Sequence, residues 1–269
     1  MWTGRMKIII RIQIWAVLIG TGFAASCTTS QPQTSPQVNA PAQTVDAILE
    51  ELENAANALK SYQACVESYF IEPLLESKTL RIGMLYYQKQ PGGSKLRINF
   101  HTLVQDDEEP EKHIEQIIFD GVWLTRIDYQ TQTVRYEQIA DENHPVDAFE
   151  FASRHIPIIG FSRPADLKNQ FEIALVDIND PNLDTAKHLL LKPKPDSKYE
   201  SEYLVIDFWT DPDTALPTKI VATTADSDTY EIKLLRPEIN KKLPNAVFRV
   251  EKPNNFDENR IPLSDRQNR

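Results

Sequence analysis

The sequence predicts an α+β protein, mainly β, in which a curved antiparallel sheet carries one helix before it and a short helical insert midway. Three observations predict this class. Apolar residues recur at helical spacing over 45–59 and alternate with polar residues from Ser61 onward, and the alternation stops between Pro145 and Phe171. Helices on one side of an antiparallel sheet form a two-layer fold around one core.

The first element is the amphipathic helix. Thr44 is a suitable N-cap, because its hydroxyl can accept a hydrogen bond from an amide of the first turn. The apolar residues that share one helical face are Val45, Ile48, Leu49, Leu52, Ala56 and Leu59. Acidic residues lie between them, so the helix has one face to bury.

The strands follow as short apolar runs separated by turn residues. Asp120-Gly121 between two apolar runs predicts a tight hairpin with positive φ angles. Residues 203–210 and 216–223 flank a proline turn, and the run 230–235 comes next. These three runs predict a meander with one solvent-exposed face and one buried face.

The insert has a second helical pattern. Pro145 can open a helix and Pro157 stops it, because proline lacks the amide hydrogen that a helix interior uses. The apolar stripe between them is Val146, Phe149, Ala152 and Ile156. The apolar run 158–161 follows, and 162–169 predicts one further helical turn.

The N-terminus carries an export signal. Basic residues precede an apolar run, 14–23, too short to span a membrane, so we expect residues 1–26 to be a signal peptide. Small residues before Cys27 resemble the bacterial lipobox, in which that thiol is lipidated, although Ala24 stands where the motif prefers leucine. Ala24-x-Ser26 also suits an ordinary signal peptidase, so lipid anchoring at Cys27 and simple cleavage both remain open.

The segment after the signal differs in composition from the rest. Residues 27–43 are mostly Thr, Ser, Gln and Pro, and we expect a disordered tether there. One globular domain should occupy 44–253, followed by a polar tail, 254–269.

Charge and motif content exclude several kinds of function. The formal net charge of −10 becomes −13 without the signal peptide, so nothing favours binding to nucleic acid. Cys65 has no partner if Cys27 is acylated, and no His or Lys lies beside it to activate the thiol. The histidines are scattered without ligand spacing, and nucleophile-elbow and phosphate-loop motifs are absent. We therefore expect no metal, no cofactor and no enzymatic activity.

What remains is apolar surface on one face of the sheet. Bulky side chains alternate along 96–100, 204–208 and 232–234, which places them on one side. They either fill a core or line a cavity, and burial statistics alone favour the core.

Several segments in order resemble the periplasmic outer-membrane lipoprotein carriers, the LolA family. They are Leu59-Lys60-Ser61-Tyr62, Gly83-Met84-Leu85-Tyr86-Tyr87 with Lys89 and Pro91, Leu96-Arg97-Ile98, the hairpin from Phe119 to Leu124, Leu216-Pro217-Thr218-Lys219-Ile220, and Asn240 to Phe248. The resemblance implies an incomplete, strongly curved barrel whose helices form a lid over a hydrophobic cavity for lipoprotein acyl chains, without a cofactor.

The resemblance also implies which residues form the site. The cavity wall would be Leu85, Tyr87, Leu96, Ile98, Phe100, Leu124, Leu204, Ile206, Phe208, Ile232 and Leu234. The lid would be Leu52, Leu59, Val146, Phe149, Ile156, Ile159 and Phe161. One departure is Gln90, which stands where the better-studied carriers have an arginine that is implicated in controlling the lid. Glutamine lacks the planar, charged guanidinium group of arginine.

The expected function is a non-enzymatic carrier or acceptor that binds acyl chains of lipoproteins or lipids. It would be exported to the periplasm, anchored to the outer membrane through Cys27, and in contact with other components of a lipoprotein-sorting pathway. The alternative is an envelope sensor or regulator of the same fold that binds a protein partner or a mislocalised lipoprotein.

Overall fold

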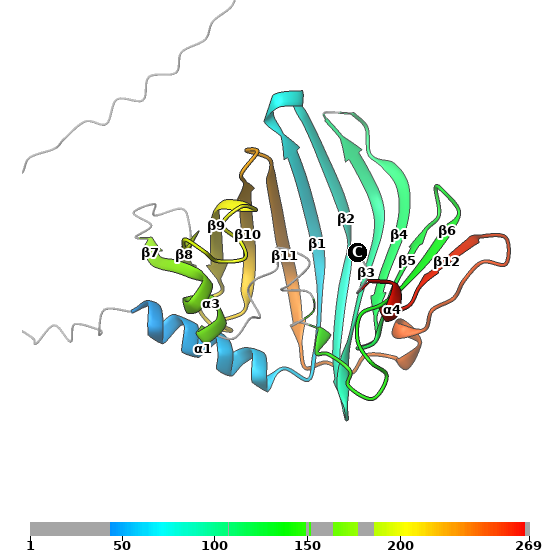
Figure 1. Cartoon of the computed structure of the whole chain (residues 1–269), viewed down its shortest axis with the longest axis horizontal. Coiled ribbons are helices and arrows are strands. Elements are labelled where there is room, and N and C mark those ends of the chain that lie inside the picture. The colour runs from blue at the N-terminus through cyan, green and yellow to red at the C-terminus, as the bar shows by residue number, and fades with distance from the viewer. Residues whose placement is uncertain (1–43, 107, 149–150, 152–163, 177–185, 267–269) are drawn as a thin grey trace, which may run out of the picture. The chain divides into compact units, whose positions relative to one another are not determined.

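The structure is a computed structural model that describes residues 44–106, 108–148, 151, 164–176 and 186–266. Within this part, twelve strands form one sheet in the order β12-β6-β5-β4-β3-β2-β1-β11-β10-β9-β8-β7 (Figure 1). The strands are β1 (Ser61–Glu72), β2 (Ser77–Gln90), β3 (Gly93–Gln105), β4 (Glu111–Phe119), β5 (Trp123–Asp128), β6 (Thr133–Gln138), β7 (Phe171–Val176), β8 (Lys187–Pro193), β9 (Tyr203–Thr210), β10 (Pro217–Thr224), β11 (Thr229–Ile239) and β12 (Asp257–Ile261). Neighbours are antiparallel, except that β12 runs parallel to β6.

The described helices are short apart from the first. They are α1 (Val45–Ala58), α3 (Pro164–Gln170) and α4 (Leu263–Arg266), with 3-10 turns η1 (Pro73–Leu75) and η3 (Asn245–Phe248). The predicted class, a mainly β fold with an N-terminal helix and a helical insert, is confirmed. No described helix has the length and apolar content needed to cross a bilayer.

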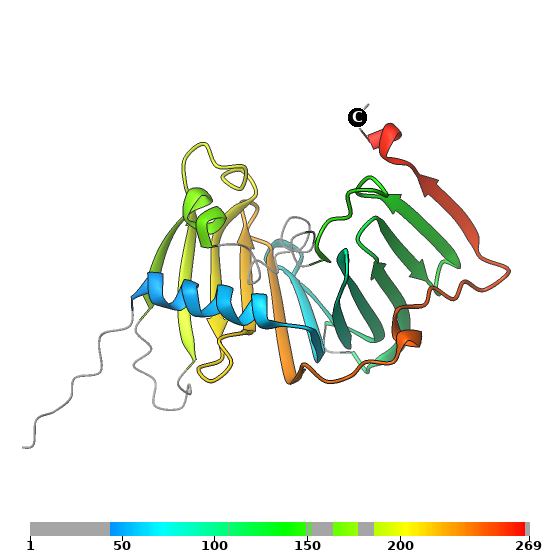
Figure 2. The ribbon, with the colours of Figure 1, turned by 90° about the horizontal axis from the view of Figure 1, so that it is seen from below.

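Helix α1 forms as its sequence pattern predicts. The Thr44 hydroxyl accepts a hydrogen bond from the Ala47 amide at 3.2 Å. Ile48, Leu49 and Leu52 are each 1% exposed and belong to the core on the inner face of the sheet. Figure 2 shows α1 running across the strands of the β7–β11 half.

The sheet is strongly curved but open. Arg126 of β5 and Glu202, just before β9, line one cavity although six strands lie between β5 and β9 in the sheet. The inner surfaces of the two halves must therefore face each other. Among the described strands, β7 pairs only with β8 and β12 only with β6, so the edges do not meet.

The predicted hairpin joins β4 to β5, with a positive φ at Gly121 but not at Asp120. The Asp120 carboxylate accepts hydrogen bonds from the amides of Val122 at 3.0 Å and Trp123 at 2.7 Å. Gly121 has φ +102°, which favours glycine.

The helical insert differs from its prediction at its start. Helical backbone appears at Ala148 and Phe151, not at Pro145, and these two side chains are 0% and 2% exposed. Val146 is half-buried against the same core. The other predicted stripe residues, Phe149, Ala152 and Ile156, lie outside the described side chains. The further turn expected over 162–169 is present as α3.

The C-terminal stretch contributes structure that the sequence pattern did not reveal. After β11 the chain crosses beneath β3–β5 and ends beside β6 as β12 (Figure 2). It covers a small second core on the outer face, formed by Ile118, Ile127 and Val134 with Phe256 packed against them. Residues 254–266 are thus part of the sheet assembly, where a polar tail was expected.

Candidate functional site

The inner face of the sheet holds a cavity of about 630 Å³. Its apolar floor consists of Val66, Ile98, Phe100, Ile117 and Ile232, from β1, β3, β4 and β11. Strand register explains this grouping, because Ile98 lies directly opposite Ile117, and Ile117 opposite Arg126. The volume is within the range of pockets that bind small ligands.

One wall of the cavity is basic. Arg81 of β2 and Arg126 of β5 line it and share the carboxylate of Glu115, at 3.4 Å and 3.6 Å. The Glu115 side chain is 9% exposed, whereas the two arginine side chains are 46% and 56% exposed. A buried carboxylate requires such partners, because an unpaired charge is costly to remove from water.

A second part of the lining is acidic and aromatic. Glu202 lies at the end of the loop before β9, and Asp226 and Asp228 lie in the turn between β10 and β11. Tyr203 and Tyr230 line the same wall, and burial raises the pKa of both phenols above the usual value of 10.0.

Only part of the predicted wall lines this cavity. Ile98, Phe100 and Ile232 do. The residues that belong to the same core without lining the cavity are Leu85, Tyr87, Leu96, Ile206, Phe208 and Leu234, with Leu124 half-buried against it. The core interpretation therefore describes most of these side chains, and the cavity is confined to one end of the inner face.

Leu204 requires a correction. It is 54% exposed, while its neighbour Tyr203 is 8% exposed. The pairing of β9 with β10 shifts register between Thr223 and Thr224, and such a bulge reverses the alternation. Tyr203 therefore takes the inner position that alternation had assigned to Leu204.

The described residues of the predicted lid pack in or against the core. Leu52 and Leu59 are each 1% exposed and belong to the core. Val146 is half-buried against the same core. The other predicted lid residues, Phe149, Ile156, Ile159 and Phe161, lie outside the described residues, as does Cys27.

Several lining residues were missed. Alternation along β1 is a signal that could have identified Val66, whereas the consecutive apolar residues Ile117, Ile118 and Phe119 of β4 leave the inner-facing position ambiguous. Nothing local identifies Arg81 and Arg126, because β3 and β4 separate their strands in the sheet. Only knowledge of strand pairing could have brought them together.

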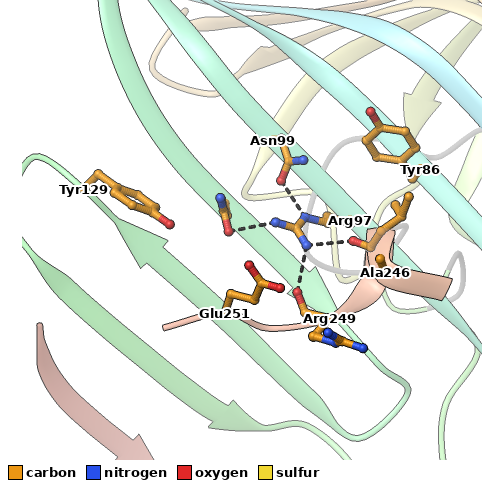
Figure 3. A pocket seen from close by; sticks show the side chains of 9 residues that line it. Tyr86, Arg97, Asn99, Tyr129, Ala246, Arg249 and Glu251 are labelled. Carbon is orange, nitrogen blue, oxygen red and sulfur yellow. Dashed lines mark hydrogen bonds between the residues drawn. The ribbon is translucent and has the colours of Figure 1, made fainter. Parts of the chain in front are cut away.

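A second, polar pocket of about 380 Å³ lies on the outer face, around Arg97 (Figure 3). The Arg97 guanidinium donates hydrogen bonds to the carbonyls of Val247 at 2.7 Å and Arg249 at 2.9 Å. It also donates to the side chains of Asn99 at 2.6 Å and Gln116 at 2.8 Å. Arg97 thus fastens the C-terminal stretch to β3 and β4, and its donors are largely used for structure.

In the described ranges, no group of three or more His, Cys, Asp or Glu side chains is placed to hold a metal ion.

No family model and no curated protein matches the chain. Solved structures do. An uncharacterised conserved protein from Thermus thermophilus has 12% identity and a TM-score of 0.49, over 81% of this chain and 99% of that one. MucB bound to MucA, from Pseudomonas aeruginosa, has 15% identity and a TM-score of 0.43, over 76% of this chain and 60% of that one.

A LolA superfamily protein from Nitrosomonas europaea has 13% identity and a TM-score of 0.32, over 78% of this chain and 99% of that one. Every one of these TM-scores is below 0.5.

Proposed function

We propose that this protein binds the acyl chain of a lipid or lipoprotein in the inner-face cavity, as a non-enzymatic carrier or acceptor of the cell envelope. The observation that carries the proposal is the cavity itself. Five apolar side chains form its floor, and charged side chains are confined to its walls. An amphiphile matches this arrangement, with its hydrocarbon on the floor and its polar end among the charges.

The expected energetics suit a carrier. Each methylene buried is worth about 0.8 kcal/mol, so a long chain gains on the order of 10 kcal/mol. This gain does not require a catalytic group. The predicted export signal supports an envelope location, and acylation at Cys27 would hold the domain at a membrane by the segment 27–43.

A fluorescent fatty-acid probe tests the proposal. We expect the mature protein to bind it saturably, and Ile117→Trp to weaken binding at least tenfold by filling the cavity. Ile117 is half-buried, so the larger ring can be accommodated without unfolding, which circular dichroism checks. The matched control is Leu204→Trp, an equal enlargement at a position 54% exposed on the other face. Absence of saturable binding, or equal loss in both variants, would contradict the proposal.

A further inference from the structure

Ion pairs within each wall of the cavity do not cancel the charge of that wall. Arg81 and Arg126 together share one carboxylate, so the basic wall retains one net positive charge. Their distances to Glu115, 3.4 Å and 3.6 Å, are longer than the 2.7–2.9 Å of a strong charge-assisted hydrogen bond. Guanidinium donors therefore remain available to an oxyanion, and phosphate matches the planar guanidinium fork.

The acidic wall is also unneutralised. Asp226 and Asp228 form no ion pair with any residue in the described ranges, and both line the cavity. Backbone hydrogen bonds hold their turn in place. The Thr224 amide donates to the Asp228 carbonyl at 2.8 Å, and the Ala225 amide donates to the Glu202 carbonyl at 3.1 Å. The carboxylates are thus presented from a fixed rim rather than from a free loop.

The lining of the cavity thus carries both signs of charge around one apolar floor. A purely anionic head group would satisfy the arginines but would be repelled by the acidic wall. An uncharged head group would leave both walls unpaired. A head group that carries both charges satisfies both walls at once and is recognised by complementarity.

We propose that the cavity selects a zwitterionic phospholipid, with the phosphate on Arg81 and Arg126 and the ammonium facing Asp226 and Asp228. This inference rests on the proposed function and adds the class of head group to it. The acyl chain lies on the floor formed by Ile98, Phe100 and Ile117.

The test compares three lipids with identical acyl chains, namely phosphatidylethanolamine, phosphatidylglycerol and diacylglycerol. Each is offered in vesicles to the mature protein, and the lipid extracted by the protein is quantified by mass spectrometry. We expect phosphatidylethanolamine to bind about tenfold more tightly than either alternative. Equal extraction of all three would overturn the head-group inference while leaving acyl binding intact, whereas extraction of none would overturn the proposed function as well.

Variants separate the two walls. Asp226→Asn with Asp228→Asn should remove the preference for phosphatidylethanolamine over phosphatidylglycerol. Arg81→Gln with Arg126→Gln should lower binding of both phospholipids about tenfold without affecting diacylglycerol. Because that pair leaves Glu115 buried and unpaired, the triple variant that adds Glu115→Gln keeps the test valid if the double variant unfolds.

Two controls complete the design. Arg135→Gln removes an arginine whose side chain is 51% exposed on β6, outside the cavity, and should change nothing. Soluble phosphoethanolamine distinguishes a lipid from a small metabolite with the same charges. If it binds as tightly as the phospholipid, the acyl chain contributes nothing and the inference is wrong; if it competes only weakly, the lipid assignment is supported.

Discussion

The ring of Phe151 stacks on the ring of Phe119, with centroids 4.2 Å apart and planes inclined by 21°. This contact joins the insert to the end of β4. The Ser94 hydroxyl reinforces it by donating to the Asp147 carboxylate at 2.5 Å and accepting from the Ala148 amide at 2.7 Å. The beginning of the insert is therefore fixed to the sheet by packing and hydrogen bonds together.

Phe151→Ala should consequently be strongly destabilising. Removing a ring that is 2% exposed leaves a cavity, and such truncations cost about 3–5 kcal/mol. Urea unfolding measures the loss. Leu74→Ala, at a side chain 86% exposed in η1, is the control and should lie within about 0.5 kcal/mol of the parent. A loss below about 1 kcal/mol for Phe151→Ala would show that the stacking contributes little.

Gly83 permits a close approach between β2 and β3. A Cβ at Gly83 would lie 2.2 Å from the Asn99 carbonyl oxygen, beside a register shift in the pairing of the two strands. Gly83→Ala should therefore destabilise the fold by about 1–3 kcal/mol, measured by thermal unfolding. Gly93→Ala is the matched control, because its Cβ would lie 3.8 Å from the nearest atom, at ordinary contact distance. Equal effects of the two substitutions would contradict this assignment.

Arg97 fastens the C-terminal stretch from Asn240 to Ile261. Arg97→Met should remove four hydrogen bonds and lower the free energy of unfolding by about 2–3 kcal/mol. It should also expose residues 245–256 to proteolysis before the rest of the domain is cut. Arg135→Met, at an exposed position, should leave the cleavage pattern unchanged. Cleavage of Arg97→Met at the parent's rate would argue against this fastening role.

Tyr62 should make the protein sensitive to alkali. Burial raises the pKa of its phenol above 10.0, and its hydroxyl is buried without a hydrogen-bond partner in the described structure. The folded state therefore keeps the proton while the unfolded state releases it, so stability is full below about pH 10 and falls as pH rises above it. Tyr62→Phe should remove this contribution and add about 1 kcal/mol at neutral pH.

Denaturant melts of Tyr62→Phe and the parent across pH 8 to 11 check this expectation, with pH 10 as the reference value for an unfolded tyrosine. Because burial also raises the pKa of Tyr87 and Tyr203, the variant should retain part of the alkaline loss. An identical pH dependence in the two proteins would contradict the role of Tyr62.

Local sequence signals predicted the elements that form through interactions between residues near one another in the sequence. Helix α1 was located to within a residue or two, because the N-cap at Thr44 and the apolar spacing agree. Strand β12 was missed, because Asp257–Ile261 shows no alternation and pairs with β6 through its backbone. Leu204 was misplaced by a bulge, which changes register without any residue type that marks it.

The site was predicted less well than the fold. Alternation identified inner-facing residues such as Ile98 and Ile232, but it does not distinguish a filled core from an open cavity. The basic wall depends on cross-strand placement of Arg81 on β2 beside Glu115 and Arg126, which lie on the hairpin strands β4 and β5. Such a grouping becomes visible only when the strand order is known.

Native mass spectrometry of the protein isolated from its own cell envelope tests whether the inner-face cavity holds lipid. We expect a bound species that dissociates to an acyl-bearing lipid, present in the parent and depleted in Ile117→Trp. A protein that carries no such species, and that also fails to take up lipid from vesicles, would contradict the claim that the inner-face cavity receives hydrocarbon.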